Sequence, residues 1–199
     1  MKYIQNYLEE TQEIVNNLDK EKLFDVIKLI KKVKKNKGRI FFLGVGGGAG
    51  HSSHAVNDFR KIAGIECYAP TDNVSELTAR INDDGWESSY KNWLKISKLS
   101  RKDLVFVFSV GGGNIKKKIS LNLVNALKYS KKIGCSISGI AGKKDGYLSQ
   151  VSNNVLIVPE INPNTITAHT EGMQAVLWHS IISHPYIQSS KMKWESQKK

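Results

Sequence analysis

Apolar side chains recur along this 199-residue chain at two spacings, one typical of helices and one typical of buried strands. Within residues 1–36 they return every three or four positions, which predicts two amphipathic helices. Short apolar runs predict strands at 39–43, 65–69, 104–110, 133–140 and 154–158. Between these runs the helical spacing returns, and it predicts helices at 51–62, 73–81, 87–96, 114–132 and 165–183 and a helical turn at 146–151.

This alternation predicts a three-layer α/β sandwich, in which a mainly parallel central sheet is covered by helices on both faces. The length is typical of one such domain, and no Pro- or Ser-rich linker marks a boundary. We therefore expect a single domain over 1–199, with amino-terminal helices at 1–36, an α/β core at 37–186 and a tail at 187–199.

Two glycine-rich turns, GVGGGAG at 44–50 and SVGGGN at 109–114, each follow an expected strand and lead into an expected helix. Glycine lets the backbone adopt positive φ and approach a ligand closely, and the first turn of a helix presents free N–H groups, which favour a phosphate. In a parallel sheet, ligands bind where these turns fall, at the carboxyl ends of strands. The alternative is a pair of tight turns that bind nothing, but two in one chain favour a site.

Neither turn matches a better-known nucleotide motif. A P-loop ends in Lys followed by Ser or Thr, whereas His51-Ser52 follows the first turn and Asn114-Ile115 the second. The first turn matches a dinucleotide-binding fingerprint only weakly, because Ala49 stands at the third position and the downstream acidic residue would have to be Glu66. The turns are therefore assigned to neither class.

The formal net charge of +12 raises the question of a nucleic-acid partner. Only four of the 30 basic residues are arginine, whereas base and phosphate readout favours arginine forks. The lysines are dispersed along the chain and form no basic stripe interleaved with aromatic residues. We therefore expect a solvated, lysine-rich surface and no nucleic-acid partner.

The two cysteines, Cys67 and Cys135, lie in apolar runs, so we expect buried core residues rather than a disulfide or a metal pair. Acidic residues interrupt the apolar stretches near the amino end, and no run approaches the roughly 20 residues of a membrane span. These features predict a cytoplasmic protein with no membrane partner.

All five histidines lie in two short segments, one directly after the first glycine turn and one on or beside the last expected helix. His54 and Asp58 are four residues apart and share a helix face, and Glu171 lies two turns before His179. These two histidines and two carboxylates form an N/O donor set that suits Zn²⁺ or a similar divalent ion. The alternative is that each histidine is an ordinary helix or packing residue.

Several of these motifs resemble one known family, the sugar isomerase (SIS) domain proteins, and within it the phosphoheptose isomerases. The resemblance covers roughly residues 22–184 and depends on order and spacing as well as residue type. Its carriers are the first glycine turn, HAVNDF at 54–59, NDDGW at 82–86, VFVFS at 105–109, and Glu171 with His179 eight residues later. It implies the SIS fold, whose sheet topology is flavodoxin-like or Rossmann-like.

The resemblance implies a ketose–aldose isomerase of a phosphorylated sugar, in this family one that converts sedoheptulose 7-phosphate to D-glycero-D-manno-heptose 7-phosphate for lipopolysaccharide or capsule synthesis. Such an enzyme moves a proton between adjacent carbons through an enediol. Asp58 and His179 match the catalytic positions of the family, and His54, Asp58, Glu171 and His179 match its zinc positions. Related proteins usually form homotetramers with active sites between subunits, which implies that residues 1–36 serve oligomerisation.

The resemblance also implies which residues contact the sugar phosphate. They lie in and just after the two glycine turns, in the 82–86 segment and on the last helix. The expected substrate-binding residues are Gly46, Gly47, Gly48, Ser52, Ser53, Asn82, Asp83, Ser109, Gly111, Gly112, Gly113, Asn114 and Glu171.

The chain departs from the family in its phosphate-binding turns. Gly48 and Val45 stand where the family has Ser and Asn, and the second turn has glycines where the family is rich in hydroxyl side chains. Backbone N–H groups or nearby serines would have to replace these donors, each hydrogen bond to a charged group being worth roughly 1.5–3 kcal/mol. A second hypothesis is therefore a non-catalytic SIS module that binds a phosphosugar as a regulator or assembly protein. Retention of all four candidate metal ligands favours the enzyme.

Overall fold

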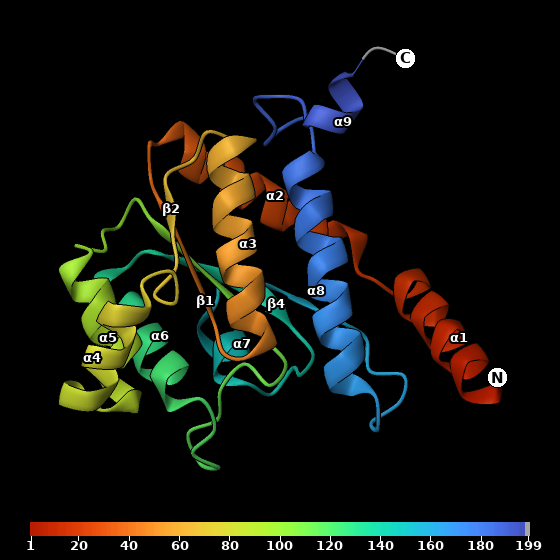
Figure 1. The fold of residues 1–199 in the computed structure, drawn as a ribbon, viewed down its shortest axis with the longest axis horizontal. Helices are drawn as coiled ribbons and strands as arrows, with labels where there is room; N and C mark the ends of the chain where they lie inside the picture. The colour runs from red at the N-terminus through yellow and green to blue at the C-terminus, as the bar shows by residue number, and fades with distance from the viewer. Residues whose placement is uncertain (198–199) are drawn as a thin grey trace.

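All five strands of the central sheet run parallel, in the order β2-β1-β3-β4-β5 (Figure 1). The structure is a computed structural model that describes residues 1–197. The strands are β1 (Ile40–Gly44), β2 (Cys67–Tyr68), β3 (Leu104–Ser109), β4 (Ser136–Ala141) and β5 (Asn154–Ile157). Gly44 at the end of β1 pairs in register with Phe108 near the end of β3. The two glycine turns that follow these strands are therefore neighbours at the carboxyl edge of the sheet.

Nine helices are described among residues 1–197, and none of them is both long enough and apolar enough to span a bilayer. They are α1 (Lys2–Asn16), α2 (Lys20–Lys35), α3 (Gly47–Lys61), α4 (Val74–Asp84), α5 (Trp86–Ile96), α6 (Leu121–Ile133), α7 (Tyr147–Val151), α8 (Ile166–Ser183) and α9 (Lys193–Ser196).

Side chains that alternate along β1 and β3 pack into two separate cores, one on each face of the sheet. Phe42 and Phe106 join α2, α3 and α8 in the first core. Phe41 and Val107 join α5, α6 and α7 in the second. A parallel sheet between two helical layers confirms the predicted fold class, and the sheet order is that of flavodoxin-like folds.

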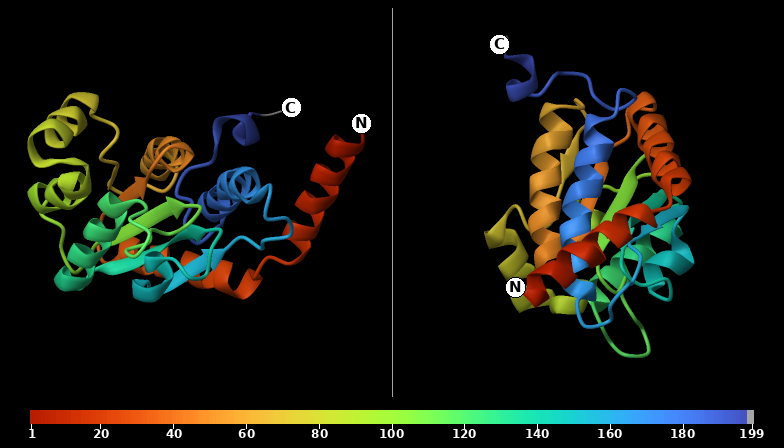
Figure 2. Two further views of the ribbon diagram at one scale, coloured as in Figure 1. Left: turned by 90° about the horizontal axis from the view of Figure 1, so that it is seen from below. Right: turned by 90° about the vertical axis from the view of Figure 1, so that its right-hand side faces the viewer.

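Helix α1 extends away from the three layers (Figure 2). The Glu10 carboxylate of α1 lies near the start of α8. There the carboxylate accepts hydrogen bonds from the side chains of Asn162 and Thr165 at 2.7 and 2.9 Å, and it pairs with His169 Nε2 at 2.8 Å. The Tyr7 ring stacks on the His169 ring with centroids 4.2 Å apart. A polar anchor therefore joins α1 to α8, while the apolar side chains at the start of α1 stay exposed.

The long helix expected at 114–132 was wrong in its first half, since α6 begins only at Leu121. Residues 114–119 instead form a small antiparallel turn, in which the backbones of Asn114 and Ile119 exchange two hydrogen bonds of 2.9 and 3.0 Å. Lys118 and Ser120 have φ values of +52° and +50°, a conformation that ends any continuous helix. Conversely, α3 begins at Gly47, inside the first glycine turn.

The expected tail at 187–199 begins on the core rather than in solvent. Ile187 is fully buried, and Lys34 Nζ donates a 2.8 Å hydrogen bond to its carbonyl. Ser189 Oγ donates to the carbonyl of Ala63 at 3.2 Å. Residues 198 and 199 of that expected tail lie outside the described residues.

Cys67 and Cys135 are both buried and unpaired, as predicted. Burial raises the pKa of the Cys135 thiol to about 12, and it raises the pKa of Cys67 further. Both side chains are therefore protonated at neutral pH and act as small core residues.

Candidate active site

Helices α3 and α8 lie side by side and run in the same direction on one face of the sheet (Figure 1). Together they carry His54, Asp58 and His179, each of which offers a ligand atom within 4.8 Å of the other two. The Asp58 Oδ2 atom lies 3.7 Å from His54 Nε2 and 3.9 Å from His179 Nε2. The helical spacing places His54 and Asp58 on one face, and the packing of α8 adds His179.

The orientation of this cluster is fixed by its neighbours. His179 Nδ1 lies 2.7 Å from the carbonyl of Ala175, which can only accept, so Nδ1 carries a proton and Nε2 is the ring nitrogen that faces Asp58. The buried Trp178 ring lies 3.5 Å from the His179 ring and 4.7 Å from the His54 ring, measured between centroids. Asp58 Oδ1 accepts a 2.8 Å hydrogen bond from Asn57.

This donor set fits a divalent metal ion. Two imidazoles and one carboxylate are ligands that Zn²⁺ prefers, and three protein ligands leave a coordination position for a substrate. The carbonyl that holds His179 Nδ1 is the kind of outer partner that fixes the tautomer of a metal-binding histidine. His54, with more than half of its side chain exposed, leaves the cluster open to solvent.

Glu171 lies outside this three-residue cluster. Its carboxylate contacts Gly47 at the start of α3, where a Cβ added to Gly47 would lie 2.5 Å from Glu171 Oε2. Glu171 also lines a cavity of about 210 Å³ between the two glycine turns. The lining residues are Val45, Gly48, Ser109, Val110, Gly111, Ile119, Ser120, Glu171 and Gln174. Of the four predicted metal ligands, the structure therefore brings three together and places the fourth in the adjacent cavity.

Glycine is required in the two turns for two reasons: some positions have positive φ, and at others a neighbouring backbone or side chain leaves no room for a Cβ. Gly46, Gly112 and Gly113 have φ values of +59°, +67° and +79°, which side chains rarely adopt. At Gly48 an added Cβ would lie 2.4 Å from the carbonyl oxygen of Phe108. The glycine at Gly48 is thus required by the contact between α3 and β3.

Replacing Gly48 by serine is expected to lower the free energy of unfolding by about 1–3 kcal/mol rather than to add a phosphate donor, because α3 must move away from the β3 backbone. Urea unfolding measures the change. Gly172→Ala on α8 is the matched control, since an added Cβ there meets nothing within 4 Å. Unchanged stability of Gly48→Ser would contradict the close contact.

Two of the three serines predicted to contact the sugar phosphate donate their hydroxyls elsewhere. Ser52 Oγ donates to the carbonyl of Gly48 at 2.9 Å, within α3, and Ser53 Oγ donates to Asp72 Oδ1 at 2.5 Å. Ser109 lines the cavity, and its Oγ accepts a 3.0 Å hydrogen bond from the backbone N–H of Gly112, which leaves its O–H free to donate. Of the three predicted serines, Ser109 is therefore the one whose hydroxyl is available at the cavity.

Asn82, Asp83 and Asn114 belong neither to the cluster nor to the residues that line the cavity. Asn82 and Asp83 end α4, which lies on the opposite side of α3 from α8 in both views (Figures 1 and 2), and Asn82 Nδ2 donates to Asp83 Oδ1 at 2.8 Å. Asn114 Oδ1 accepts a 2.9 Å hydrogen bond from the backbone of Lys117. Their expected roles in substrate binding remain predictions.

Two residues of this region were missed as site residues from the sequence. His51 lies one turn after Gly47, with its ring 5.9 Å from the Phe108 ring. Burial lowers its pKa, while the backbone and the charge of Glu171 oppose that shift, so His51 and Glu171 are neighbours. Gln174 lines the cavity one turn after Glu171 and is fully buried. Helical spacing could have indicated both residues. His51 is four residues after Gly47 and Gln174 is three residues after Glu171, so each shares a helix face with a residue that was predicted for the site.

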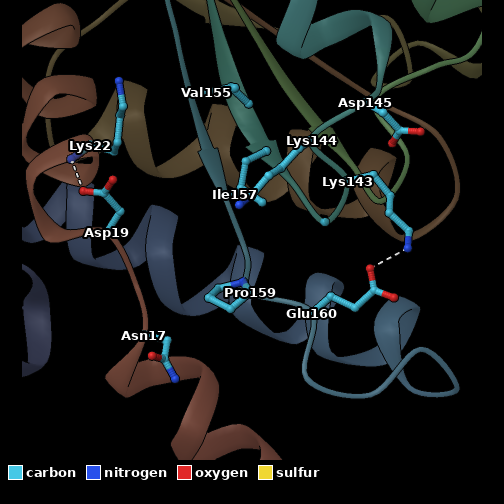
Figure 3. A pocket seen from close by; sticks show the side chains of 11 residues that line it. Asn17, Asp19, Lys22, Lys143, Lys144, Asp145, Val155, Ile157, Pro159 and Glu160 are labelled. Atoms are coloured by element: carbon cyan, nitrogen blue, oxygen red, sulfur yellow. Dashed lines mark hydrogen bonds and ion pairs between the residues drawn. The ribbon is translucent and has the colours of Figure 1, made fainter.

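A larger hollow of about 770 Å³ lies between the start of α2, the end of β5 and the loop after β4 (Figure 3). Three of its charged groups have partners: Asp19 accepts from the backbone N–H of Lys22 at 2.8 Å, and Lys143 pairs with Glu160. None of the residues that the sequence predicted for the site lines it. The α3–α8 cluster and its adjacent cavity are therefore the candidate active site.

No protein-family model matches the chain. The phosphoheptose isomerase of Aliarcobacter butzleri is 26% identical over 166 residues, which cover 81% of this chain and 82% of that protein. A probable phosphoheptose isomerase of Thermoplasma acidophilum is 25% identical over 180 residues, which cover 88% and 93%. A phosphoheptose isomerase structure from Francisella tularensis shares the fold, with a TM-score of 0.77 and 19% identity over 91% of this chain and 95% of that one.

Proposed function

The chain is a phosphoheptose isomerase-like protein of the SIS-domain family, and from this premise we propose that it interconverts the ketose and aldose forms of a phosphorylated sugar. The proposed substrate is sedoheptulose 7-phosphate, and the proposed product is D-glycero-D-manno-heptose 7-phosphate. The observation that carries the proposal is the cluster of His54, Asp58 and His179 beside the cavity between the glycine turns.

Ketose–aldose isomerisation passes through an enediol, so it needs groups that move protons and a positive charge near the sugar oxygens. We propose that His54, Asp58 and His179 hold a divalent ion, with Zn²⁺ the first choice. A bound ion of this kind supplies Lewis-acid stabilisation of the negative charge that develops on oxygen. The Nδ1 contact of His179 with Ala175 supports this role because it keeps Nε2 free to bind.

The phosphate group is assigned to the cavity edge formed by the glycine turns. Because position 48 is glycine, the donors at this edge are backbone N–H groups and the Ser109 hydroxyl, whose O–H stays free to donate. Turn N–H groups and the first turn of a helix bind phosphate in many α/β proteins. This arrangement supports a phosphosugar ligand held by the backbone and by the Ser109 hydroxyl.

A homotetramer with active sites between subunits is part of the same proposal. The exposed apolar side chains of α1, Tyr3, Ile4 and Leu8, support it, because they form an apolar stripe on a helix that leaves the body of the subunit.

A second candidate function is a phosphosugar-binding regulator or assembly protein without turnover. The glycines that stand in the second turn, where the family is rich in hydroxyl side chains, favour it, since phosphate affinity depends on such donors.

The two functions are separated by measuring binding and turnover on the same metal-loaded sample. Isothermal titration with sedoheptulose 7-phosphate reports binding, and NMR of the sugar signals reports conversion to the aldose. The isomerase proposal predicts both, whereas binding without conversion, across this and other ketose phosphates, supports the regulator and contradicts the enzyme.

A further inference from the structure

We propose that a groove between α5 and α6 binds a nucleoside di- or triphosphate, at a site separate from the candidate active site. The groove has a volume of about 360 Å³ and is lined by Lys91, Lys95, Asn125, Lys128, Tyr129 and Lys132. Helices α5 and α6 lie side by side and pack on the second core, whereas α3 and α8 pack on the first (Figure 1). The lysine groove therefore lies on the opposite face of the sheet, and the proposal does not rest on the proposed isomerase function.

All the charged groups that line the lysine groove are ammonium groups. By contrast, the 770 Å³ hollow beside α2 is lined by three lysines and three carboxylates, so its charges balance. Helix α6 contains no acidic residue, and Glu87, the one carboxylate of α5, does not line the groove. Among residues 1–197, none of the four lysines forms an ion pair. The groove thus gathers four positive charges without a negative partner.

Helical spacing places these lysines in two pairs. Lys91 and Lys95 are four residues apart on α5, and Lys128 and Lys132 are four residues apart on α6. Like charges at this spacing repel each other and destabilise a helix. The helix dipole favours Lys95 and Lys132, which lie in the last turns of their helices, but not Lys91 and Lys128. A bound polyanion relieves the repulsion within both pairs.

The arrangement of the four lysines fits linked phosphate groups better than a single phosphate. Residues four apart on a helix have Cβ atoms about 6 Å apart, and packed helices lie about 8–10 Å apart. Four ammonium groups on flexible stems that start from the corners of such a rectangle can surround a chain of phosphates. One phosphate monoester carries at most about two negative charges, so further phosphates are needed to balance the groove.

Tyr129 and Asn125 supply the uncharged part of the site. The Tyr129 side chain is partly buried against the second core, so its ring is held in the wall of the groove. Asn125 lies one turn before Tyr129, and its Nδ2 donates a 3.0 Å hydrogen bond to the carbonyl of Glu87 on α5. This bond fixes the amide and leaves Oδ1 as an acceptor for a ligand. An aromatic ring beside an amide oxygen suits a nucleobase, which stacks on the ring and donates from its amino group.

A small ligand fits the lysine groove better than a nucleic-acid strand does. The volume lies within the range of about 300–1,000 Å³ that is typical of small-molecule sites. A strand is held by a longer basic groove with successive aromatic rings for successive bases. Here one aromatic ring lines the groove, and the other lysines are dispersed along the chain.

The first test measures ATP binding to the full chain by isothermal titration at an ionic strength of about 0.15 M. In Lys91→Gln/Lys128→Gln we expect the Kd for ATP to rise by about 10-fold or more, because hydrogen bonds to charged groups are lost. Lys20→Gln/Lys32→Gln is the matched control, since it removes two exposed lysines from α2 and should keep the wild-type Kd. Equal weakening in both double variants would overturn the site, because it would show a diffuse attraction to the whole surface.

The second test separates the nucleobase from the phosphates. Tyr129→Leu is expected to raise the Kd for ATP by about 5- to 100-fold, because stacking is lost, and to leave the Kd for inorganic tripolyphosphate unchanged. Tyr129→Phe keeps the ring and should keep the wild-type Kd for ATP. Equal binding of ATP by Tyr129→Leu and wild type would contradict the stacking role of Tyr129.

The third test asks whether the lysine groove is independent of the candidate active site. His179→Ala is expected to bind ATP with the wild-type Kd, whether or not the wild-type protein isomerises a sugar phosphate. Loss of ATP binding in folded His179→Ala would place ATP at the α3–α8 cluster and overturn the proposal. It would also be overturned if the wild-type protein showed no saturable ATP binding, or if it bound a single-stranded RNA oligonucleotide more tightly than ATP through the same lysines.

Discussion

Replacing His179 by alanine is expected to lower kcat/KM for ketose–aldose isomerisation by about 10²–10⁴-fold, the usual range for a residue that acts in proton transfer or charge stabilisation. From α8, His179 Nε2 lies 3.9 Å from Asp58 Oδ2. The contact of Nδ1 with the Ala175 carbonyl fixes the orientation of the ring and leaves Nε2 directed toward Asp58. The same variant should bind zinc more weakly. Steady-state kinetics and metal analysis on one sample measure both effects.

His184→Ala is the matched control, since this histidine lies just beyond the end of α8 and contacts Phe24 and Tyr186 rather than the cluster. It should keep wild-type zinc content and turnover. Treatment of the wild-type protein with EDTA should reproduce the loss seen in His179→Ala, and added Zn²⁺ should restore activity. Undiminished turnover of His179→Ala would exclude the cluster as the catalytic centre.

Replacing Asp103 by alanine is expected to lower the free energy of unfolding by about 3–5 kcal/mol, the range for removing one partner of a buried ion pair. Asp103 is 2% exposed and accepts hydrogen bonds from the backbone N–H, Nε and Nη2 of Arg39 and from the backbone N–H and hydroxyl of Ser100. It joins the start of β1 to the start of β3. Its loss leaves the Arg39 guanidinium without its carboxylate partner.

The contribution of Asp103 should also depend on pH. Burial raises the pKa of this carboxyl, but the hydrogen bonds from Arg39 and Ser100 lower it by more, so the folded-state pKa lies below the unfolded value of about 3.9. The unfolded state therefore binds protons first as the pH falls. The stability is fully present above the unfolded pKa and is lost as pH falls through the folded pKa.

Urea unfolding of the wild-type protein and of Asp103→Ala at pH 7 and at pH 3 measures this effect. The difference between the two proteins should shrink at pH 3. Asp25→Ala, which removes the exposed ion pair with Lys28, should change stability little at either pH. A difference between wild type and Asp103→Ala that stays constant with pH would contradict the assigned pKa shift.

Sequence patterns predicted those features of the fold that are set by residues close together in the chain. Uninterrupted apolar runs located β1 and β3, because a parallel sheet buries both faces of its strands. The i, i+4 spacing placed His54 and Asp58 together, because one helix fixes their geometry. The helix expected from residue 114 was wrong because left-handed backbone at Lys118 and Ser120 outweighs the apolar spacing.

The remaining features of the site depend on contacts between segments far apart in the chain. Sequence spacing alone cannot state that Glu171 lies against Gly47 while His179 lies against Asp58, because this follows from the parallel packing of α3 on α8. The reason for glycine at position 48 is likewise the nearby Phe108 carbonyl, which belongs to another strand.

The most direct test is the rate of conversion of sedoheptulose 7-phosphate by wild-type protein loaded with increasing amounts of Zn²⁺, with bound zinc determined on each sample. The proposed function predicts an aldose phosphate product whose rate of formation rises in proportion to bound zinc and reaches its limit at one ion per chain. A folded, fully zinc-loaded protein that binds the sugar and forms no aldose phosphate would contradict it.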